Sequence, residues 1–342
     1  MVFPSKQKTC AEYYRVIQLA IAVIVILSLT GCGVPRIKLF SDATDPLKEY
    51  TIEGSKKGKV AVIDIDGVIS NMQKRGLFFR DMPSMVQEVV SQLKMAEKDK
   101  EVKAIVLKVN SPGGTTTASD ILYKEILDFK EKTGTKVVVT MMDVAASGGY
   151  YISLPADYIM AHPTTVTGSI GVIFMRLEAY GLMEKIGVGV NVNKSGRNKD
   201  MGSPFRQPTD EEEEIFNSLI GNLSTRFLDL VKKHRNPENT SFDEIKTARV
   251  YVADDALKAG LIDEIGYVKD ALSHAKKLGN LHDDAKVVVY RRSEYPNDNI
   301  YNTSTSHYQG NGLALVNVDL FNSLPAFKTG FYYLWWPSAA GN

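Results

Sequence analysis

One serine in this sequence occupies a position typical of a nucleophile. The stretch "DVAASGGYYIS", residues 143–153, places Ser147 among alanines and glycines. A serine hydroxyl attacks carbonyl groups poorly unless a neighbouring base accepts its proton and hydrogen-bond donors stabilise the oxyanion that forms. If Ser147 is a nucleophile, the chain must therefore supply a base and an oxyanion site.

Two glycine-rich turns could supply the donors. "SPGG", residues 111–114, follows the apolar run 102–110, and "ASGG", residues 146–149, follows the apolar run 135–142 by a few positions. Glycines let the backbone turn tightly and leave its N–H groups uncovered. Each motif alone is commonly a plain strand-to-helix turn. Because the carboxyl ends of successive parallel strands meet at one sheet edge, we expect one turn to carry the nucleophile and the other an oxyanion donor.

Histidine is the usual base for a serine nucleophile, but no histidine here is well placed. His162 directly precedes Pro163, which favours a turn. The other four lie on or after predicted helices, away from the strand-end turns: His234, His274, His282 and His307. A Ser-His-Asp triad is poorly supported.

Lysine can act as the base where burial disfavours its charged form. The stretch "NKSGRNKDMGSPF", residues 193–205, contains Lys194, Arg197 and Lys199, and it follows the run "GVGVNVN", which we predict to be a buried strand. Arginine does not lose its proton in proteins, which excludes Arg197. The residues alone leave Lys194 and Lys199 as equal candidates.

Apolar strands and amphipathic helices alternate from Lys59 onward, which predicts an α/β fold with a mostly parallel sheet and crossover helices. The predicted strands are 59–66, 102–110, 135–142, 157–161 and 187–193, and the predicted helices are 81–99, 117–134, a short one from Ser147, 209–234 and 252–260. Acidic residues open the helix 209–234, where they match its dipole. We interpret Glu211 to Glu214 as solvated surface rather than as a metal site.

The rest of the composition narrows the chemistry. The formal net charge of the 342 residues is +1, which gives no electrostatic hold on nucleic acid. The two cysteines are Cys10 and Cys32, both near the N-terminus, so a disulfide, a zinc site and a cysteine nucleophile are not expected in the rest of the chain. We predict that the protein uses no metal and no other cofactor.

The N-terminus has the pattern of a secretion signal. Basic residues precede the apolar run 16–29, which is short for a membrane span and ends in "LTGC", residues 29–32. This sequence resembles a bacterial lipobox, in which Cys32 would carry the lipid. The alternative is an uncleaved membrane anchor. Both predict a tether in the bacterial cell envelope with the catalytic domain outside the cytoplasm.

We predict four parts of the chain. They are a lipoprotein signal or anchor at 1–31, a tether at 32–58, a catalytic domain at 59–291 and a C-terminal extension at 292–342. The extension begins with a polar loop and ends in the aromatic stretch 327–337, which is most simply a packed strand or an interface patch.

Five motifs in order resemble the half-length bacterial signal peptide peptidase A family, whose members are Ser-Lys proteases of the Clp protease/crotonase fold. They are "NSPGG", "AASGGYYI", "TGSIGV", "SGRNKDMGSP" and "RVYVADDALKAGLIDEIG", and the resemblance runs from about Lys59 to Leu278. The fold that this implies is a repeated ββα superhelix with a mostly parallel sheet.

The resemblance also implies roles for single residues. Ser147 would be the nucleophile and Lys199 the general base, in preference to Lys194. The hydroxyl of Ser169 would orient the lysine, and the N–H groups of Gly114 and Gly148 would face the oxyanion. Family members often carry tyrosine where this chain has Asn198. The implied reaction is hydrolysis of apolar signal-peptide remnants through an acyl-enzyme.

Half-length relatives resemble one another in forming homo-oligomeric rings, of which an octamer is one form, with serine and lysine from neighbouring subunits. Two other functions fit the same fold. A crotonase-type acyl-CoA enzyme would need carboxylates at the site and a cytosolic location, and a non-catalytic membrane scaffold would need neither Ser147 nor Lys199.

Overall fold

The computed structural model describes residues 15, 17, 18, 45–75, 81–235, 237, 239–303 and 329–335. The chain divides into two units, Met1–Ser41 and Asp42–Asn342, and the second holds the elements described below. Among the described residues, no helix combines the length and hydrophobicity needed to cross a membrane. Cys32, nearly all of the run 16–29 and His307 lie outside the described residues.

A mostly parallel sheet forms the centre of the second unit, as predicted. Its order is β1-β13-β2-β5-β7-β8-β12, and every pair in this order is parallel except β1 with β13. β9 adds to β7 in parallel, and β11 pairs with β9 antiparallel. The strands are β1 (Lys48–Glu53), β2 (Lys56–Asp66), β5 (Val102–Ser111), β7 (Lys136–Ala146), β8 (Tyr158–Ala161), β9 (Val166–Gly168), β11 (Val250–Val252), β12 (Glu264–Ile265) and β13 (Ala285–Arg291).

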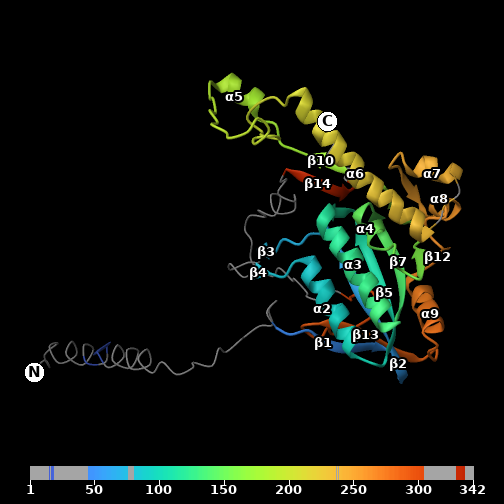
Figure 1. The fold of residues 1–342 in the computed structure, drawn as a ribbon. Coiled ribbons are helices and arrows are strands. Elements are labelled where there is room, and N and C mark those ends of the chain that lie inside the picture. The colour runs from blue at the N-terminus through green and yellow to red at the C-terminus, as the bar shows by residue number, and fades with distance from the viewer. Residues whose placement is uncertain are drawn as a thin grey trace, which may run out of the picture. The chain divides into compact units, whose positions relative to one another are not determined.

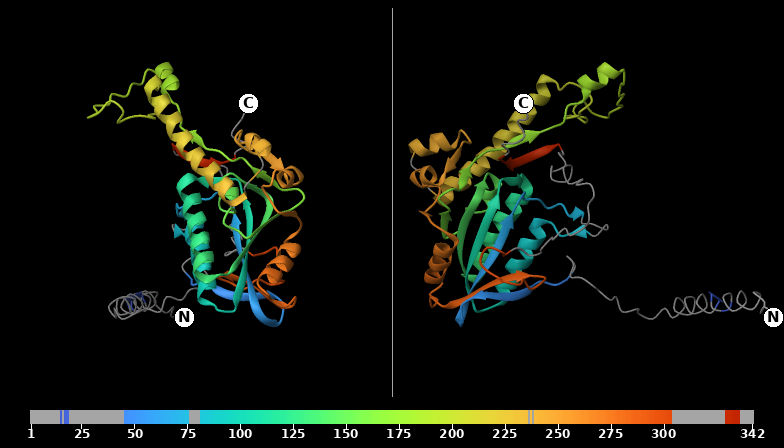
Figure 2. Two further views of the ribbon diagram at one scale, coloured as in Figure 1. Left: turned by 45° about the vertical axis from the view of Figure 1, so that its right-hand side comes forward. Right: turned by 180° about the vertical axis from the view of Figure 1, so that it is seen from behind.

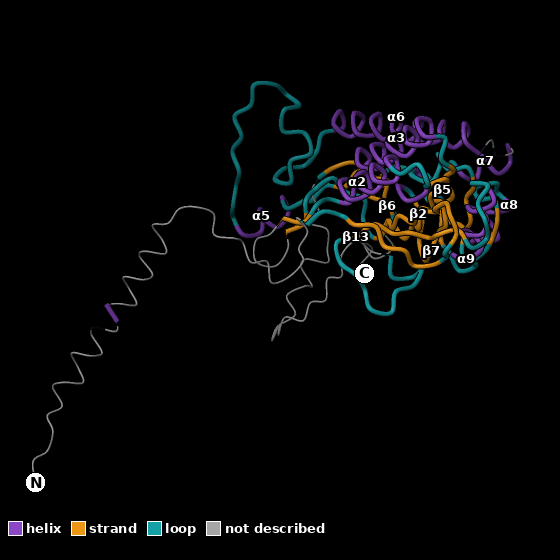
Figure 3. Tube along the Cα trace, turned by 90° about the horizontal axis from the view of Figure 1, so that it is seen from below, coloured by secondary structure: helices purple, strands orange, loops and turns teal. Residues whose placement is uncertain are grey.

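The central strands are buried on both faces, which is why their sequences are almost continuous runs of valine and isoleucine. Ile63 and Ile65 of β2 pack with the helices α2 (Met85–Lys98) and α3 (Thr116–Thr133), whereas Val60 and Val62 pack with α9 (Val268–Leu278) on the opposite face. Figures 1 and 3 show this three-layer arrangement.

The helices begin and end where the sequence supplies caps. Ser84 and Gln87 form a capping box at the start of α2, and α3 ends at Gly134, which adopts the left-handed conformation. α6 (Asp210–Arg235) has acidic residues in its first turn and basic residues in its last, in agreement with its dipole. The shorter helices are α4 (Gly148–Tyr151), α5 (Tyr180–Ile186), α7 (Asn239–Ile245) and α8 (Ala253–Lys258).

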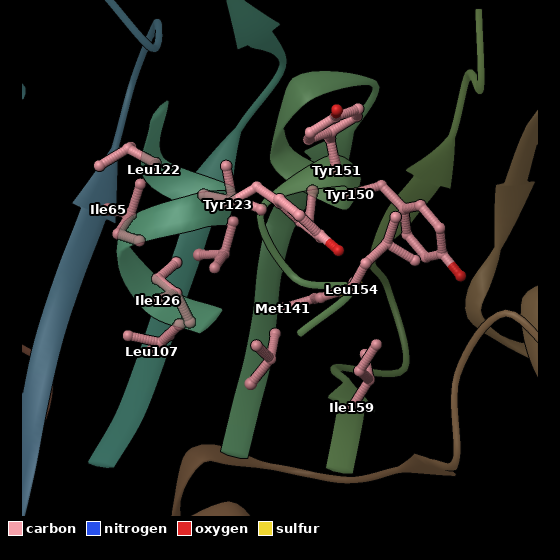
Figure 4. Close-up of a cluster of buried hydrophobic side chains, with 14 of the residues drawn as sticks. Ile65, Leu107, Leu122, Tyr123, Ile126, Met141, Tyr150, Tyr151, Leu154 and Ile159 are labelled. Atoms are coloured by element: carbon pink, nitrogen blue, oxygen red, sulfur yellow. The ribbon is translucent and has the colours of Figure 1, made fainter. Parts of the chain in front are cut away.

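The aromatic C-terminal stretch is a packed strand. β14 (Gly330–Leu334) lies between β10 (Ile173–Met175) and β6 (Gly113–Thr115) and is antiparallel to both. Tyr333 is 1% exposed, and its ring stacks on Tyr151. Tyr151 belongs to the large apolar cluster drawn in Figure 4, so β14 extends the core of the fold. A separate two-stranded ribbon joins β3 (Lys74–Arg75) and β4 (Asp81–Met82).

The predicted buried strand at 187–193 is wrong. α5 ends at Gly187 in the left-handed conformation, and the residues that follow form no strand. Val188, Val190 and Val192 are 51%, 49% and 47% exposed. The alternating valines suit a strand, but they pair with no strand among the described residues. Figures 1 and 2 show α5 and the loop after it projecting away from the sheet.

Candidate active site

Ser147 lies in a constrained turn between β7 and α4. Its φ of 53° and ψ of −113° are unusual for a residue with a side chain, and such conformations cost about 1–3 kcal/mol. Its backbone N–H donates to the Gly168 carbonyl oxygen at 2.7 Å, which holds the turn against the end of β9. The adjoining sheet therefore maintains a conformation that the residue would not adopt by itself.

The side chain of Ser147 is buried without a partner. The residue is 1% exposed, and its Oγ has no hydrogen-bond partner among the described residues. A buried polar atom without a hydrogen bond lowers the free energy of unfolding by about 1–3 kcal/mol, and folded proteins contain few such atoms. No described residue therefore binds the Ser147 hydroxyl.

The two glycine-rich turns meet beside Ser147, as predicted. An added Cβ on Gly113 would lie 2.7 Å from the backbone nitrogen of Gly148, and one on Gly114 would lie 1.9 Å from the Ile69 carbonyl oxygen. Gly113 has a φ of +103°, and its N–H donates to the Ser111 hydroxyl at 3.1 Å. Only glycines permit backbones to approach this closely.

β14 places a carbonyl group over this pair of turns. An added Cβ would lie 2.0 Å from the Tyr333 carbonyl oxygen if built on Gly113, and 3.0 Å from it if built on Gly148. In the antiparallel register, Tyr333 is opposite Gly114. The Tyr333 carbonyl group thus packs against both of the glycine-rich turns that precede and follow the predicted oxyanion site.

Ser169 follows the residue that binds the Ser147 backbone. Gly168 and Ser169 both have positive φ, of 86° and 50°, and the Ser169 N–H donates to the Arg249 carbonyl oxygen at 2.8 Å. The Ser169 hydroxyl has no hydrogen-bond partner among the described residues. Ser169 thus adjoins the residue that binds the Ser147 backbone, but no described lysine makes the predicted contact with its hydroxyl.

Lys199 does not reach Ser147 within one chain. It is exposed in the loop that projects beyond α5 (Figure 2), and its ammonium group has neither a hydrogen bond nor an ion pair among the described residues. Lys194, the other candidate, is paired with Asp200 at 2.6 Å. The structure therefore brings together Ser147, Gly114, Gly148 and Ser169 and leaves the predicted base apart from them.

The described histidines have structural contacts, as expected. His162 contacts the Thr164 hydroxyl at 2.8 Å, His234 contacts the Tyr123 hydroxyl at 2.8 Å, and His274 stacks on Tyr158. Burial, with help from nearby Lys233, lowers the pKa of His234. None of the histidines in the described part of the chain bonds to Ser147, so a serine–histidine pair is not formed.

The acidic start of α6 is only partly the solvated surface that we predicted. The Glu212 side chain is 2% exposed and binds Arg206, so the interpretation is wrong for this residue. Glu211 pairs with Arg197 at 2.6 Å. Within the described residues, no group of histidine, cysteine, aspartate or glutamate side chains could hold a metal ion.

Comparison with known proteins identifies the class as serine protease. The sequence profile of Peptidase family S49 matches residues 129–282, and that of Clp protease matches residues 69–166. A protein named as signal peptide peptidase SppA in Enterococcus faecium is 38% identical over 264 residues, which are 77% of this chain and 75% of that protein. The chain belongs to peptidase family S49 and is a protease of the signal peptide peptidase type.

Two further proteins are similar over shorter parts of their length or at lower identity. Protease 4 of Haemophilus influenzae is 34% identical over 76% of this chain, which corresponds to 41% of that longer protein. Among solved structures, a membrane-bound stomatin-specific protease matches 65% of this chain and 86% of its own, with 18% identity and a TM-score of 0.42.

The close approach of the two turns makes a prediction about stability. We expect Gly114→Ala to lower the free energy of unfolding by about 1–3 kcal/mol, because the added Cβ would overlap the Ile69 carbonyl group. Gly221→Ala is the control, since nothing lies within 4 Å of its added Cβ and alanine favours the helix α6. Thermal unfolding followed by circular dichroism measures both, and equal melting temperatures for the two variants would contradict the packing described.

Proposed function

We propose that this protein is a membrane-tethered serine endopeptidase that degrades remnant signal peptides with a Ser147–Lys199 dyad. The observation that carries the proposal is the buried Ser147 hydroxyl, which has no partner among the described residues and lies beside two glycine-rich turns that approach each other closely. Membership of peptidase family S49 supports the same reaction. The lipobox at Cys32 or an uncleaved anchor would provide the tether.

The mechanism assigns one proton path. Neutral Lys199 accepts the Ser147 proton as the hydroxyl oxygen attacks the substrate carbonyl carbon, and the N–H groups of Gly114 and Gly148 stabilise the oxyanion. The lysine then gives this proton to the leaving amine as the peptide C–N bond breaks. In the second half, Lys199 deprotonates a water molecule that attacks the acyl-enzyme, and the proton returns to the Ser147 oxygen. Ser169 would orient the lysine amine.

The proposed base reaches the nucleophile by assembly of identical chains. The projecting segment exposes a row of apolar side chains that suits burial against a second copy: Leu182, Ile186, Val188, Val190 and Val192. The three valines alternate, so they share one face of an extended chain that could add to another strand. Burial of the segment would remove water from Lys199 and favour its neutral form.

β6, which lies beside the Ser147 turn, suits pairing with an extended apolar peptide. β6 pairs with an extended segment of this chain, β14, whose Tyr333 side chain packs against the rings of Tyr151 and Phe227. The burial of Tyr333 raises its pKa to about 12. A substrate that pairs with β6 in the same way would place an apolar side chain against these rings and its carbonyl oxygen near Gly114 and Gly148.

The two rival functions have less support. A crotonase-type enzyme would use carboxylates at the site, but the described contacts of the Ser147 turn are with backbone groups and hydroxyls. A non-catalytic scaffold would gain nothing from a strained turn with a buried hydroxyl that lacks a partner.

The dyad makes the first prediction about activity. In the full-length protein in detergent, Ser147→Ala and Lys199→Ala should each lower kcat/KM on a fluorogenic apolar peptide by at least about 10³-fold, because each removes a group that takes part in bond formation. Lys194→Ala, which removes a nearby lysine of the same loop, should keep most of the activity. Turnover near that of the unaltered protein in Lys199→Ala would exclude this lysine as the base.

The proposed pairing of substrate with β6 gives a second prediction. A chain that ends at Lys328 lacks β14 and should bind apolar peptides with a several-fold lower KM, because the edge of β6 is then open to substrate. Tyr333→Phe is the control: it keeps the strand and loses only the hydroxyl that donates to the Leu223 carbonyl oxygen at 3.1 Å. A peptide of residues 329–335 should inhibit the shortened chain competitively. An unchanged KM, with no inhibition by this peptide, would contradict the proposed binding mode.

A further inference from the structure

The residue after Lys199 is held by two cations. Both oxygens of the Asp200 carboxylate accept hydrogen bonds from Arg206, at 2.8 and 2.9 Å, and one of them also accepts from the Lys194 ammonium at 2.6 Å. The two-pronged arginine contact is the strongest geometry for such a pair. Arg206 and, to a lesser extent, Lys194 hold the pKa of Asp200 well below its usual range. Asp200 thus remains a carboxylate at every working pH.

Arg206 also joins the lysine loop to α6. Its guanidinium donates to both carboxylate oxygens of Glu212, one of them at 2.9 Å, and Glu212 is buried in the first turn of that helix. The Glu212 side chain closes the turn as well, because it accepts from the Thr209 N–H at 3.0 Å. The loop is therefore connected to a fixed point on a long helix.

A second connection lies on the other side of Lys199. Asn198, its preceding neighbour, donates to Glu211 at 3.3 Å, and Arg197 donates to the same carboxylate at 2.6 Å. Glu213, the next acidic residue of the helix, pairs with Arg176. Of the two chain neighbours of Lys199, Asn198 is thus bound to α6 and Asp200 is bound to Arg206, which itself binds α6. The Lys199 side chain has no partner among the described residues.

The ion pairs of Asp200 affect the charge state of Lys199, which must lose its proton to act as a base. Asp200 is the anion nearest to Lys199 in sequence, and a free carboxylate there could pair with the ammonium group and favour its charged form. In the structure, Arg206 and Lys194 occupy this carboxylate. The ion pairs of the loop and the start of α6 join the cations Arg176, Lys194, Arg197 and Arg206 to the anions Glu178, Asp200, Glu211, Glu212 and Glu213.

We propose that Arg206 is a positioning residue for the general base. It fixes the Lys199 loop on α6 through Glu212, and it keeps the Asp200 carboxylate from pairing with the Lys199 amine. This inference rests on the proposed role of Lys199. It accounts for a buried glutamate at the start of α6 and for an aspartate directly beside a base that needs to be neutral.

The test is the pH dependence of kcat/KM on an apolar peptide, measured for the full-length protein. Activity falls at low pH as the base becomes protonated, so a higher pKa of Lys199 moves this limb to higher pH. Arg206→Gln should move the limb upward by about one pH unit, because Asp200 then keeps only Lys194 as a partner and has an oxygen available to the Lys199 amine. Adding Asp200→Asn to Arg206→Gln should return the limb to its original position, since the carboxylate is then gone.

Arg197→Gln is the matched control. It removes a cation from the same loop, but Arg197 is bound to Glu211 rather than to Asp200, so the limb should stay in place. Sedimentation and thermal unfolding show whether each variant keeps its fold and assembly. An Arg206→Gln limb that does not move, or that stays shifted when Asp200→Asn is added, would overturn the proposal.

The outcomes separate this inference from the proposed function. If Lys199→Ala is active, the assignment of the base fails whatever Arg206→Gln does. If Lys199→Ala is inactive and Arg206→Gln lowers kcat without a shift of the pH limb, only the role of Arg206 fails, because a purely structural residue would have that effect.

Discussion

The candidate site depends on the close approach of three backbone segments at the end of the sheet. The hydrogen bond from Ser147 to the Gly168 carbonyl joins β9 to the turn before α4, and the glycines of β6 let that strand lie against the same turn. The apolar burial of β2, β5 and β7 stabilises this edge, so the fold can hold Ser147 at a φ that costs about 1–3 kcal/mol. The position of Ser147 therefore depends on the whole sheet.

Within the described residues, the proposed nucleophile and the proposed base lie apart. The buried Ser147 hydroxyl has no described partner, while the lysine loop projects from the sheet on an exposed apolar segment. Burial of that segment in an assembly would complete the dyad and desolvate the base in one step. The ion pairs of Arg206 would keep the conformation and the local charge of the Lys199 loop the same before and after assembly.

Local sequence patterns predicted most of the fold, because the buried strands and capped helices carry their signals within a few residues. The strand predicted at 187–193 was wrong because the alternation of Val188, Val190 and Val192 is a local signal, whereas a strand also needs a partner strand, and the described residues supply none. Sequence reasoning found the Ser147 turn but could not choose between Lys194 and Lys199 without a family resemblance. It missed Arg206 and Glu212, because their pairing depends on how a loop folds back on a helix.

The central claim is that nucleophile and base come from different copies of the chain. Mixing Ser147→Ala with Lys199→Ala tests it directly, after dissociation and reassembly of the two full-length proteins. Because a mixed assembly contains junctions with an intact Ser147 and an intact Lys199, the mixture should recover a measurable part of the original peptidase activity, while each variant reassembled alone stays inactive. Mixed assemblies that form and show no recovered activity would contradict the claim.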